Sequence, residues 1–316
     1  MLTTFLYTLS PMLVLFACIL AGFLLKKLKV LPENTGTVVS KLENYIFVPA
    51  LVFSTFSTYC TRETIKENYL LIVYSSVALL IAFLIAIPLS NVFYKKGEYA
   101  NGVYRYALVF ANFSFMGNAI VPAILGGDEF LYLYLLFTLP LNAAVYTWGI
   151  RVLTPRKLRK TSKIKNLINP IFLSLVSGAV FGVFDLGRFL PEFMITSINY
   201  FKNCMAPLAM FLTGFIIGGY SLKELLLDRK VYFASLMRLI VLPVIIIFVL
   251  WFLGARGLSL VFCLFSFATP LGINTVVFPA AFGTDTKAGA SMALISHILC
   301  VITIPVMYSI LVMILS

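Results

Sequence analysis

The chain has 316 residues, of which 61% are hydrophobic and 11% are charged, and its mean hydropathy is +1.01. A water-soluble domain is roughly half apolar and a quarter charged, so a single soluble core could not bury this surplus of apolar side chains. Composition therefore excludes a soluble protein. The net charge of +12 does not indicate nucleic-acid binding, because the basic residues lie in short connections between apolar segments.

Ten apolar segments follow one another along the chain, and each is close to the length of about 20 residues that crosses a bilayer as a helix. They cover residues 5–25, 38–56, 69–93, 102–125, 129–152, 166–186, 194–220, 230–253, 257–281 and 288–315. The first segment has no basic residues before it and no small-residue cleavage site after it. We therefore interpret it as a retained helix and not as a signal peptide.

The basic residues are distributed unequally between the two sides of these segments. Sixteen lie in the connections on the side of the 151–165 loop, and four lie on the other side, namely Arg62, Lys66, Arg188 and Arg256. Cytoplasmic loops are enriched in Lys and Arg. The count predicts a multi-pass protein of the plasma membrane with the 151–165 loop in the cytoplasm and both termini outside.

Four prolines of the first half recur in the second half at offsets of 157 to 159 residues. They are Pro11, Pro32, Pro49 and Pro122, followed by Pro170, Pro191, Pro207 and Pro279. Each half has five segments, an odd number, so the second half crosses the membrane in the opposite sense. The pattern predicts a single all-α membrane domain of two inverted repeats, at 1–152 and 166–316, joined by a basic linker at 153–165. Inverted repeats are typical of secondary transporters.

The fourth and ninth segments carry polar and helix-breaking residues at their centres. A broken helix leaves backbone N–H groups with partial positive charge, which suit a carboxylate. We therefore predict a binding site for a small organic anion, to which the fifth segment also contributes. The residues of this predicted site are Asn112, Gly117, Asn118, Asn142, Pro270, Gly272 and Asn274. The alternative is that these residues only permit close helix packing and interhelical hydrogen bonds.

Three further polar residues inside apolar segments are candidates for ion coupling or gating. Lys202 and Arg238 are costly in lipid and functional by default, unless their side chains extend to the membrane interface. His297 is the only histidine and titrates near physiological pH, although hydrogen-bonded interior histidines are more common. Glu43 is expected to pair with Lys41, or else to carry a coupled proton.

The sequence has no metal cluster, catalytic triad, phosphate loop or carboxylate dyad. It therefore predicts neither an enzyme nor a bound cofactor or metal, and leaves H⁺ and Na⁺ as candidates for a coupling ion. The leading hypothesis is an alternating-access carrier, a permease for a small organic anion in the lipid bilayer. A non-transporting binding or sensing protein and a channel of the same fold remain alternatives.

Several of these segments resemble the auxin efflux carrier family, which includes plant PIN carriers and bacterial organic-acid permeases. Residues 112–117 look like the family's N-x-x-F-M-G segment, and residues 268–274 look like its ninth-helix break. The resemblance covers essentially the whole chain. It implies ten helices, broken and crossing fourth and ninth helices, and a scaffold of helices one, two, six and seven through which a homodimer could form.

The resemblance also implies roles for two residues, Asn112 as the asparagine that helps bind the substrate carboxylate and Pro270 as the proline of the ninth-helix crossover. The chain departs from the family at Ala119, where many members have proline, and at Val52, where plant carriers have serine. Its short basic linker replaces the long hydrophilic loop of many plant carriers. An indole acid is therefore not predicted as the substrate. Malate or malonate as the substrate is suggested only by analogy with bacterial members of the family.

Overall fold

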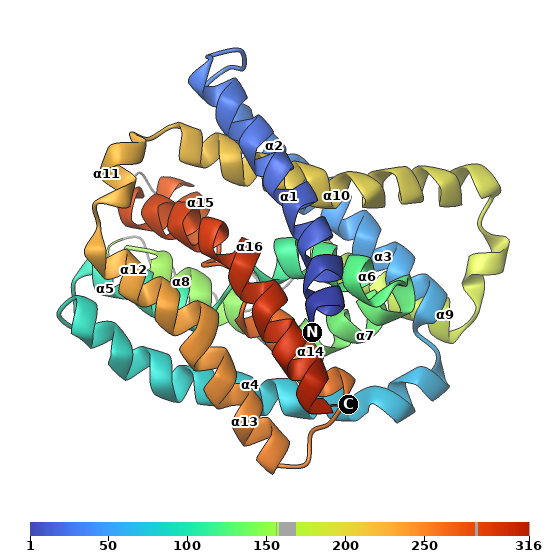
Figure 1. Ribbon diagram of the computed structural model, residues 1–316. Coiled ribbons are helices and arrows are strands. Elements are labelled where there is room, and N and C mark those ends of the chain that lie inside the picture. The colour runs from blue at the N-terminus through green and yellow to red at the C-terminus, as the bar shows by residue number, and fades with distance from the viewer. Residues whose placement is uncertain (156, 158–168, 282–283, 316) are drawn as a thin grey trace.

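The computed structural model describes residues 1–155, 157, 169–281 and 284–315. Most of the predicted basic linker, and residues 282 and 283 just after the ninth apolar segment, therefore lie outside the described residues. The described part is helical apart from short connections and one isolated antiparallel bridge, between Ala111 and Leu271. The all-α class predicted from the sequence is confirmed (Figure 1).

The first half contains α1 (Leu2–Lys27), α2 (Thr35–Leu42), η1 (Glu43–Phe47), α3 (Val48–Tyr59), α4 (Arg62–Phe93), α5 (Tyr99–Val109), η2 (Phe113–Gly117), α6 (Asn118–Leu125), α7 (Asp128–Ala144), η3 (Val145–Gly149) and α8 (Ile150–Leu153). The second half contains α9 (Pro170–Val183), η5 (Leu186–Phe189), α10 (Glu192–Gly218), α11 (Leu222–Leu226), α12 (Arg229–Leu236), η6 (Met237–Val241), α13 (Leu242–Phe252), α14 (Leu258–Phe267), α15 (Asn274–Ala281) and α16 (Lys287–Leu315).

Six helices of the described chain are long and apolar enough to cross a membrane. They are Leu2–Lys27, Arg62–Phe93, Asp128–Leu153, Glu192–Gly218, Arg229–Phe252 and Lys287–Leu315. The other four predicted segments are not among these six. Residues 38–56 fall in α2, η1 and α3, residues 166–186 form the short α9, and the fourth and ninth segments are each split in two.

Four of the helical segments contain a π-helical turn, at η1, η2, η3 and η6. A π turn adds one residue to the helical repeat, and such turns are frequent at functional sites. In the second, fifth and eighth apolar segments the π turn joins α-helix on both sides without a gap. The turn therefore changes which side chains face the interior without breaking the helix.

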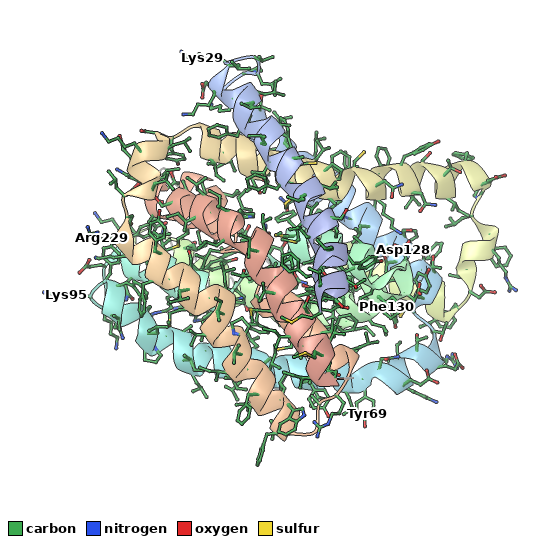
Figure 2. All side chains as sticks on the ribbon, viewed as in Figure 1. Lys29, Tyr69, Lys95, Asp128, Phe130 and Arg229 are labelled. Carbon is green, nitrogen blue, oxygen red and sulfur yellow. The ribbon has the colours of Figure 1, made fainter. Side chains whose placement is uncertain are left out.

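The basic connections and the opposite connections lie at different ends of the molecule. Figure 2 shows Lys29 at the top and Arg229 and Lys95 at the left, with Asp128 at the right and Tyr69 at the lower right. Helices α1 and α16 pack against each other, and the two termini lie at the lower ends of these helices (Figure 1).

Glycines permit the closest helix crossing, between α1 and α10. A Cβ atom at Gly22 would overlap the Phe211 carbonyl oxygen, and one at Gly214 would overlap the Ile19 carbonyl oxygen. Figure 1 shows α1 crossing α10. Helix α3 packs in a similar way on Gly178 of α9, and α10 also packs on α3. The four helices α1, α3, α9 and α10 thus form one packed group.

Replacing Gly214 by valine is expected to destabilise the protein, because the obstructing atom is backbone and cannot rotate away. Overpacking of this kind costs roughly 1–3 kcal/mol. The thermal unfolding midpoint in detergent, read by tryptophan fluorescence, should fall by several degrees. Gly187→Val is the control, since no atom lies within 4 Å of a Cβ there. An unchanged midpoint for Gly214→Val would contradict this packing.

Candidate functional site

The fourth and ninth segments are each interrupted, and the two interruptions lie side by side. Helix α5 ends at Val109 and η2 begins at Phe113, while α14 ends at Phe267 and α15 begins at Asn274. The Asn112 N–H donates to the Pro270 carbonyl at 2.7 Å, within the antiparallel bridge between Ala111 and Leu271. Backbone groups freed by the breaks therefore bond to each other, as burial in a membrane protein requires.

The two breaks have different local causes. Pro270 has no backbone N–H, and the α conformation is disfavoured for the residue before a proline, so α14 ends shortly before it. The fourth segment has no proline at its break. There Phe110 is extended, and Asn112 has φ −82° and ψ 42°, which lies outside the helical region. The Asn112 carbonyl then accepts from Met116 and Gly117, which starts the next helical piece.

A cavity of about 440 Å³ lies beside the paired breaks. Its polar lining comes from both halves of the chain and consists of Ser40, Lys41, Asn44, Tyr45, Asn112, Ser114, Asn142, Tyr146 and Asn274. Lys41 is the one charged residue among the described residues that line it, and none of them is acidic. The apolar lining includes Val48, Ile171 and Val277. A cavity with one cation, several amides and an apolar wall fits a small amphipathic anion.

The π turns contribute directly to this lining. Asn44 and Tyr45 belong to η1, and Val145 and Tyr146 belong to η3. Because a π turn shifts the register of the side chains, adjacent residues on one helix reach the same cavity. The site is thus built from two helix breaks and two irregular helical turns.

Four of the seven predicted binding residues line the cavity, namely Asn112, Asn142, Gly272 and Asn274. The Asn274 amide donates to the Tyr106 hydroxyl at 3.0 Å, and the Asn142 amide donates to the Thr138 carbonyl at 3.2 Å. Gly272 permits the approach of the two breaks, since a Cβ there would lie 3.3 Å from the Ala111 carbonyl oxygen. A substrate-binding role for these residues stays a prediction.

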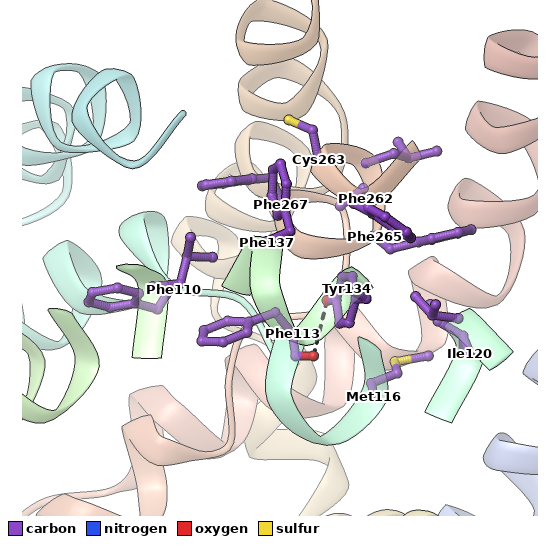
Figure 3. Close-up of a cluster of buried hydrophobic side chains, with 14 of the residues drawn as sticks. Phe110, Phe113, Met116, Ile120, Tyr134, Phe137, Phe262, Cys263, Phe265 and Phe267 are labelled. Atoms are coloured by element: carbon purple, nitrogen blue, oxygen red, sulfur yellow. Dashed lines mark hydrogen bonds between the residues drawn. The ribbon is translucent and has the colours of Figure 1, made fainter. Parts of the chain in front are cut away.

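The other three predicted residues lie outside the cavity lining. Gly117 packs on Tyr134, whose hydroxyl donates to the Phe113 carbonyl at 3.1 Å (Figure 3). Asn118 is buried at the start of α6, and its Oδ1 has no partner among the described residues. Pro270 holds the break through its carbonyl. Gly117 thus takes part in close helix packing, and a binding role for Gly117, Asn118 and Pro270 stays a prediction.

The three candidates for ion coupling or gating have separate surroundings. The Lys202 ammonium pairs with the Asp128 carboxylate, which joins α10 to the start of α7 away from the cavity. Arg238 does not reach an interface, since it is fully buried, with its guanidinium donating to the Leu108 carbonyl at 3.2 Å. His297 is buried beside Asn112, with 3.4 Å between its Nε2 and the Asn112 Nδ2.

The predicted pairing of Glu43 with Lys41 was wrong. Both Glu43 carboxylate oxygens are buried and have no hydrogen-bond partner among the described residues, and Lys41 lines the cavity instead. Two positions apart on a helix, the two side chains point in different directions. The contribution of Lys41 was missed, although the spacing of Lys41, Asn44 and Val48 places them on one helical face.

A family model described as membrane transport protein matches residues 7–160 and 154–308 of this chain. The chain belongs to this family, the auxin efflux carriers. A similar member is an uncharacterized transporter of Methanocaldococcus jannaschii, 26% identical over 293 residues, which are 90% of this chain and 92% of that protein. The chain is thus a multi-pass member of an auxin efflux carrier family of membrane transporters, which are generally not enzymes.

Proposed function

We propose that this protein is a secondary transporter that moves a small organic anion, such as a carboxylate, across the plasma membrane by alternating access. The observation that carries the proposal is the cavity beside the paired breaks, with Lys41 as the single charge among its described lining residues. A cation would favour acidic walls, and none of the described residues of this lining is acidic.

The helix ends at the cavity add to its positive potential. The helical piece Phe113–Leu125 and helix α15 both begin at the cavity, and Phe113, Ser114 and Asn274 of their first turns line it. A helix N-terminus carries partial positive charge of about +0.5 and N–H groups without helical partners. Two such ends and one lysine favour a carboxylate, while the apolar wall accommodates the organic part of the substrate.

Ten spans arranged as two inverted five-helix repeats are part of the same proposal. The residues that pair at the breaks are separated by 158 positions for Asn112 and Pro270, and by 160 for Ala111 and Leu271. The prolines recur at nearly the same offset. Equivalent positions of two inverted repeats meet at the two-fold axis that relates the repeats, which accounts for an antiparallel pairing of equivalent residues there.

The cavity continues toward the basic side of the molecule. A second cavity of about 620 Å³ shares Ser40, Lys41 and Val277 with the first and extends to Lys26 and Tyr220. Since the connection after α1 is basic, we assign this side to the cytoplasm and the termini to the outside. In this assignment the site faces inward, and an outward-facing state completes the transport cycle.

Uptake into proteoliposomes tests the proposal, with lactate, benzoate, malonate and malate as labelled probes and their methyl esters as neutral controls. We expect saturable uptake of at least one acid and none of the esters. Replacing Lys41 by glutamine should raise the KM of that acid about tenfold, since a charge-assisted contact is worth roughly 1.5–3 kcal/mol.

Lys66→Gln is the matched control for this experiment, because Lys66 is an exposed lysine at the start of α4. Its KM should equal that of the wild type. Equal KM values for Lys41→Gln and the wild type would exclude Lys41 from anion binding. Saturable uptake of the esters, above that of protein-free liposomes and with the KM of the acids, would contradict an anion carrier.

A further inference from the structure

His297 has one defined hydrogen bond that fixes its tautomer. Its Nδ1 lies 2.7 Å from the Ala293 carbonyl oxygen on the same helix. A carbonyl only accepts, so Nδ1 carries a hydrogen. The neutral ring then has its lone pair on Nε2, which accepts a hydrogen bond from the Asn112 amide Nδ2 at 3.4 Å. The neutral histidine thus holds one of the two N–H groups of Asn112 away from other partners.

A proton on Nε2 would reverse this arrangement. The imidazolium donates from both nitrogens, so its Nε2–H would oppose the Asn112 N–H. Rotation of the amide about its last bond relieves this conflict, because Oδ1 then accepts from His297. Both N–H groups of Asn112 become free to donate to a carboxylate in the cavity that Asn112 lines.

No acidic side chain is placed to balance such a charge. Helix α16 packs on α1, α5, α10, α11, α12, α14, α15 and η6. The buried or half-buried titratable groups on these elements, as far as the structure describes them, are Cys18, Lys26, Tyr99, Tyr104, Arg105, Tyr106, Lys202, Cys204, Arg238 and Cys263. None is a carboxylate. A protonated His297 therefore gains a counter-charge only when an anion occupies the cavity.

We propose that transport of the anion is coupled to a proton carried on His297, with Asn112 linking the two. The inference rests on the proposed function. The proton passes from water to the His297 Nε2, and no covalent bond forms or breaks. Anion and proton favour the same state of the Asn112 amide and neutralise each other in a buried site, so each raises the affinity for the other. His297 is a positioning residue and does not itself contact the anion.

The pH dependence of KM tests this coupling. Counterflow of the best acid among lactate, benzoate, malonate and malate is measured in proteoliposomes with equal pH on both sides, from pH 5.5 to 8. If one proton binds with each anion, the wild-type KM should rise about tenfold per pH unit at the alkaline end. Protein-free liposomes correct for diffusion of the undissociated acid.

Two variants separate coupling from structure. His297→Gln presents a neutral amide that can donate to Asn112 at every pH, so counterflow should persist with a KM that does not change with pH. Cys300→Ser, one turn along α16 with its donor group kept, should retain the wild-type slope.

A wild-type KM that is flat over this range overturns the coupling while leaving the transport proposal intact, and this result does not depend on any variant. A pH-dependent KM in folded His297→Gln overturns the assignment to His297. Absence of counterflow in the wild type at every pH instead contradicts the proposed function itself.

Discussion

Replacement of Asn112 by alanine is expected to abolish carboxylate uptake in a protein that still folds. The Asn112 side chain lines the cavity, whereas its backbone N–H and carbonyl hold the break through Pro270, Met116 and Gly117. Alanine keeps these backbone bonds. Loss of a charge-assisted amide contact, together with an unpaired bound carboxylate, corresponds to roughly 3 kcal/mol, or about a hundredfold in kcat/KM.

Asn118→Ala is the matched control for this variant. Asn118 is as buried as Asn112 and lies six residues further along the chain, yet it is outside the cavity lining. The kcat/KM of Asn118→Ala should stay within about twofold of the wild-type value. Only the loss of interactions with the bound substrate lowers kcat/KM, and Asn118 is not expected to make any. Unchanged kinetics in Asn112→Ala would remove Asn112 from the site.

Replacement of Arg238 by methionine is expected to destabilise the paired breaks and to stop transport. The Arg238 guanidinium donates to the Leu108 carbonyl at the end of α5 and lies 5.3 Å from the centre of the Phe267 ring at the end of α14. A helix C-terminus carries about −0.5 charge, so two such ends amount to about one negative charge. The positive charge of Arg238 lies beside both of these ends.

Loss of a hydrogen bond from a charged donor to a buried carbonyl costs roughly 1.5–3 kcal/mol. Arg238→Met should therefore lower the thermal unfolding midpoint and the yield of monodisperse protein. Substrate uptake should fall in the same variant. Arg238→Lys should recover part of the midpoint, since an ammonium keeps the charge but lacks the planar guanidinium. Arg229→Met, at the exposed start of α12, serves as the control. A wild-type midpoint in Arg238→Met would show that the helix ends do not require this charge.

The sequence predicted the helical segments and both breaks because hydropathy and helix-breaking residues are local properties. Pro270 ends a helix wherever it stands, and Asn112 and Gly117 are poor helix formers inside an apolar segment. The crossing of the fourth and ninth helices came from the family resemblance, and the bond between Asn112 and Pro270 from the structure alone, since two breaks that far apart in the chain give no local signal of contact.

The burial of individual side chains could not be predicted, because lipid-facing and interior-facing residues of a membrane helix are equally apolar. In α13, Leu242 and Ile246 are buried while Val244 and Phe248 are exposed, with little to distinguish them in hydropathy. The same lack of contrast left open whether Arg238 reaches an interface. It also concealed the irregular turn of η1, in which Asn44 lines the cavity while Glu43 does not.

Counterflow in proteoliposomes is the most direct test of an anion carrier with its site at the paired breaks. Vesicles containing the wild-type protein are loaded with an unlabelled acid from the panel and diluted into a trace of the same labelled acid. We expect transient accumulation of label above equilibrium, saturation with external acid, and loss of both in Asn112→Ala. Wild-type protein that binds the acids without accumulating label, or that passes them without saturation, would contradict this account.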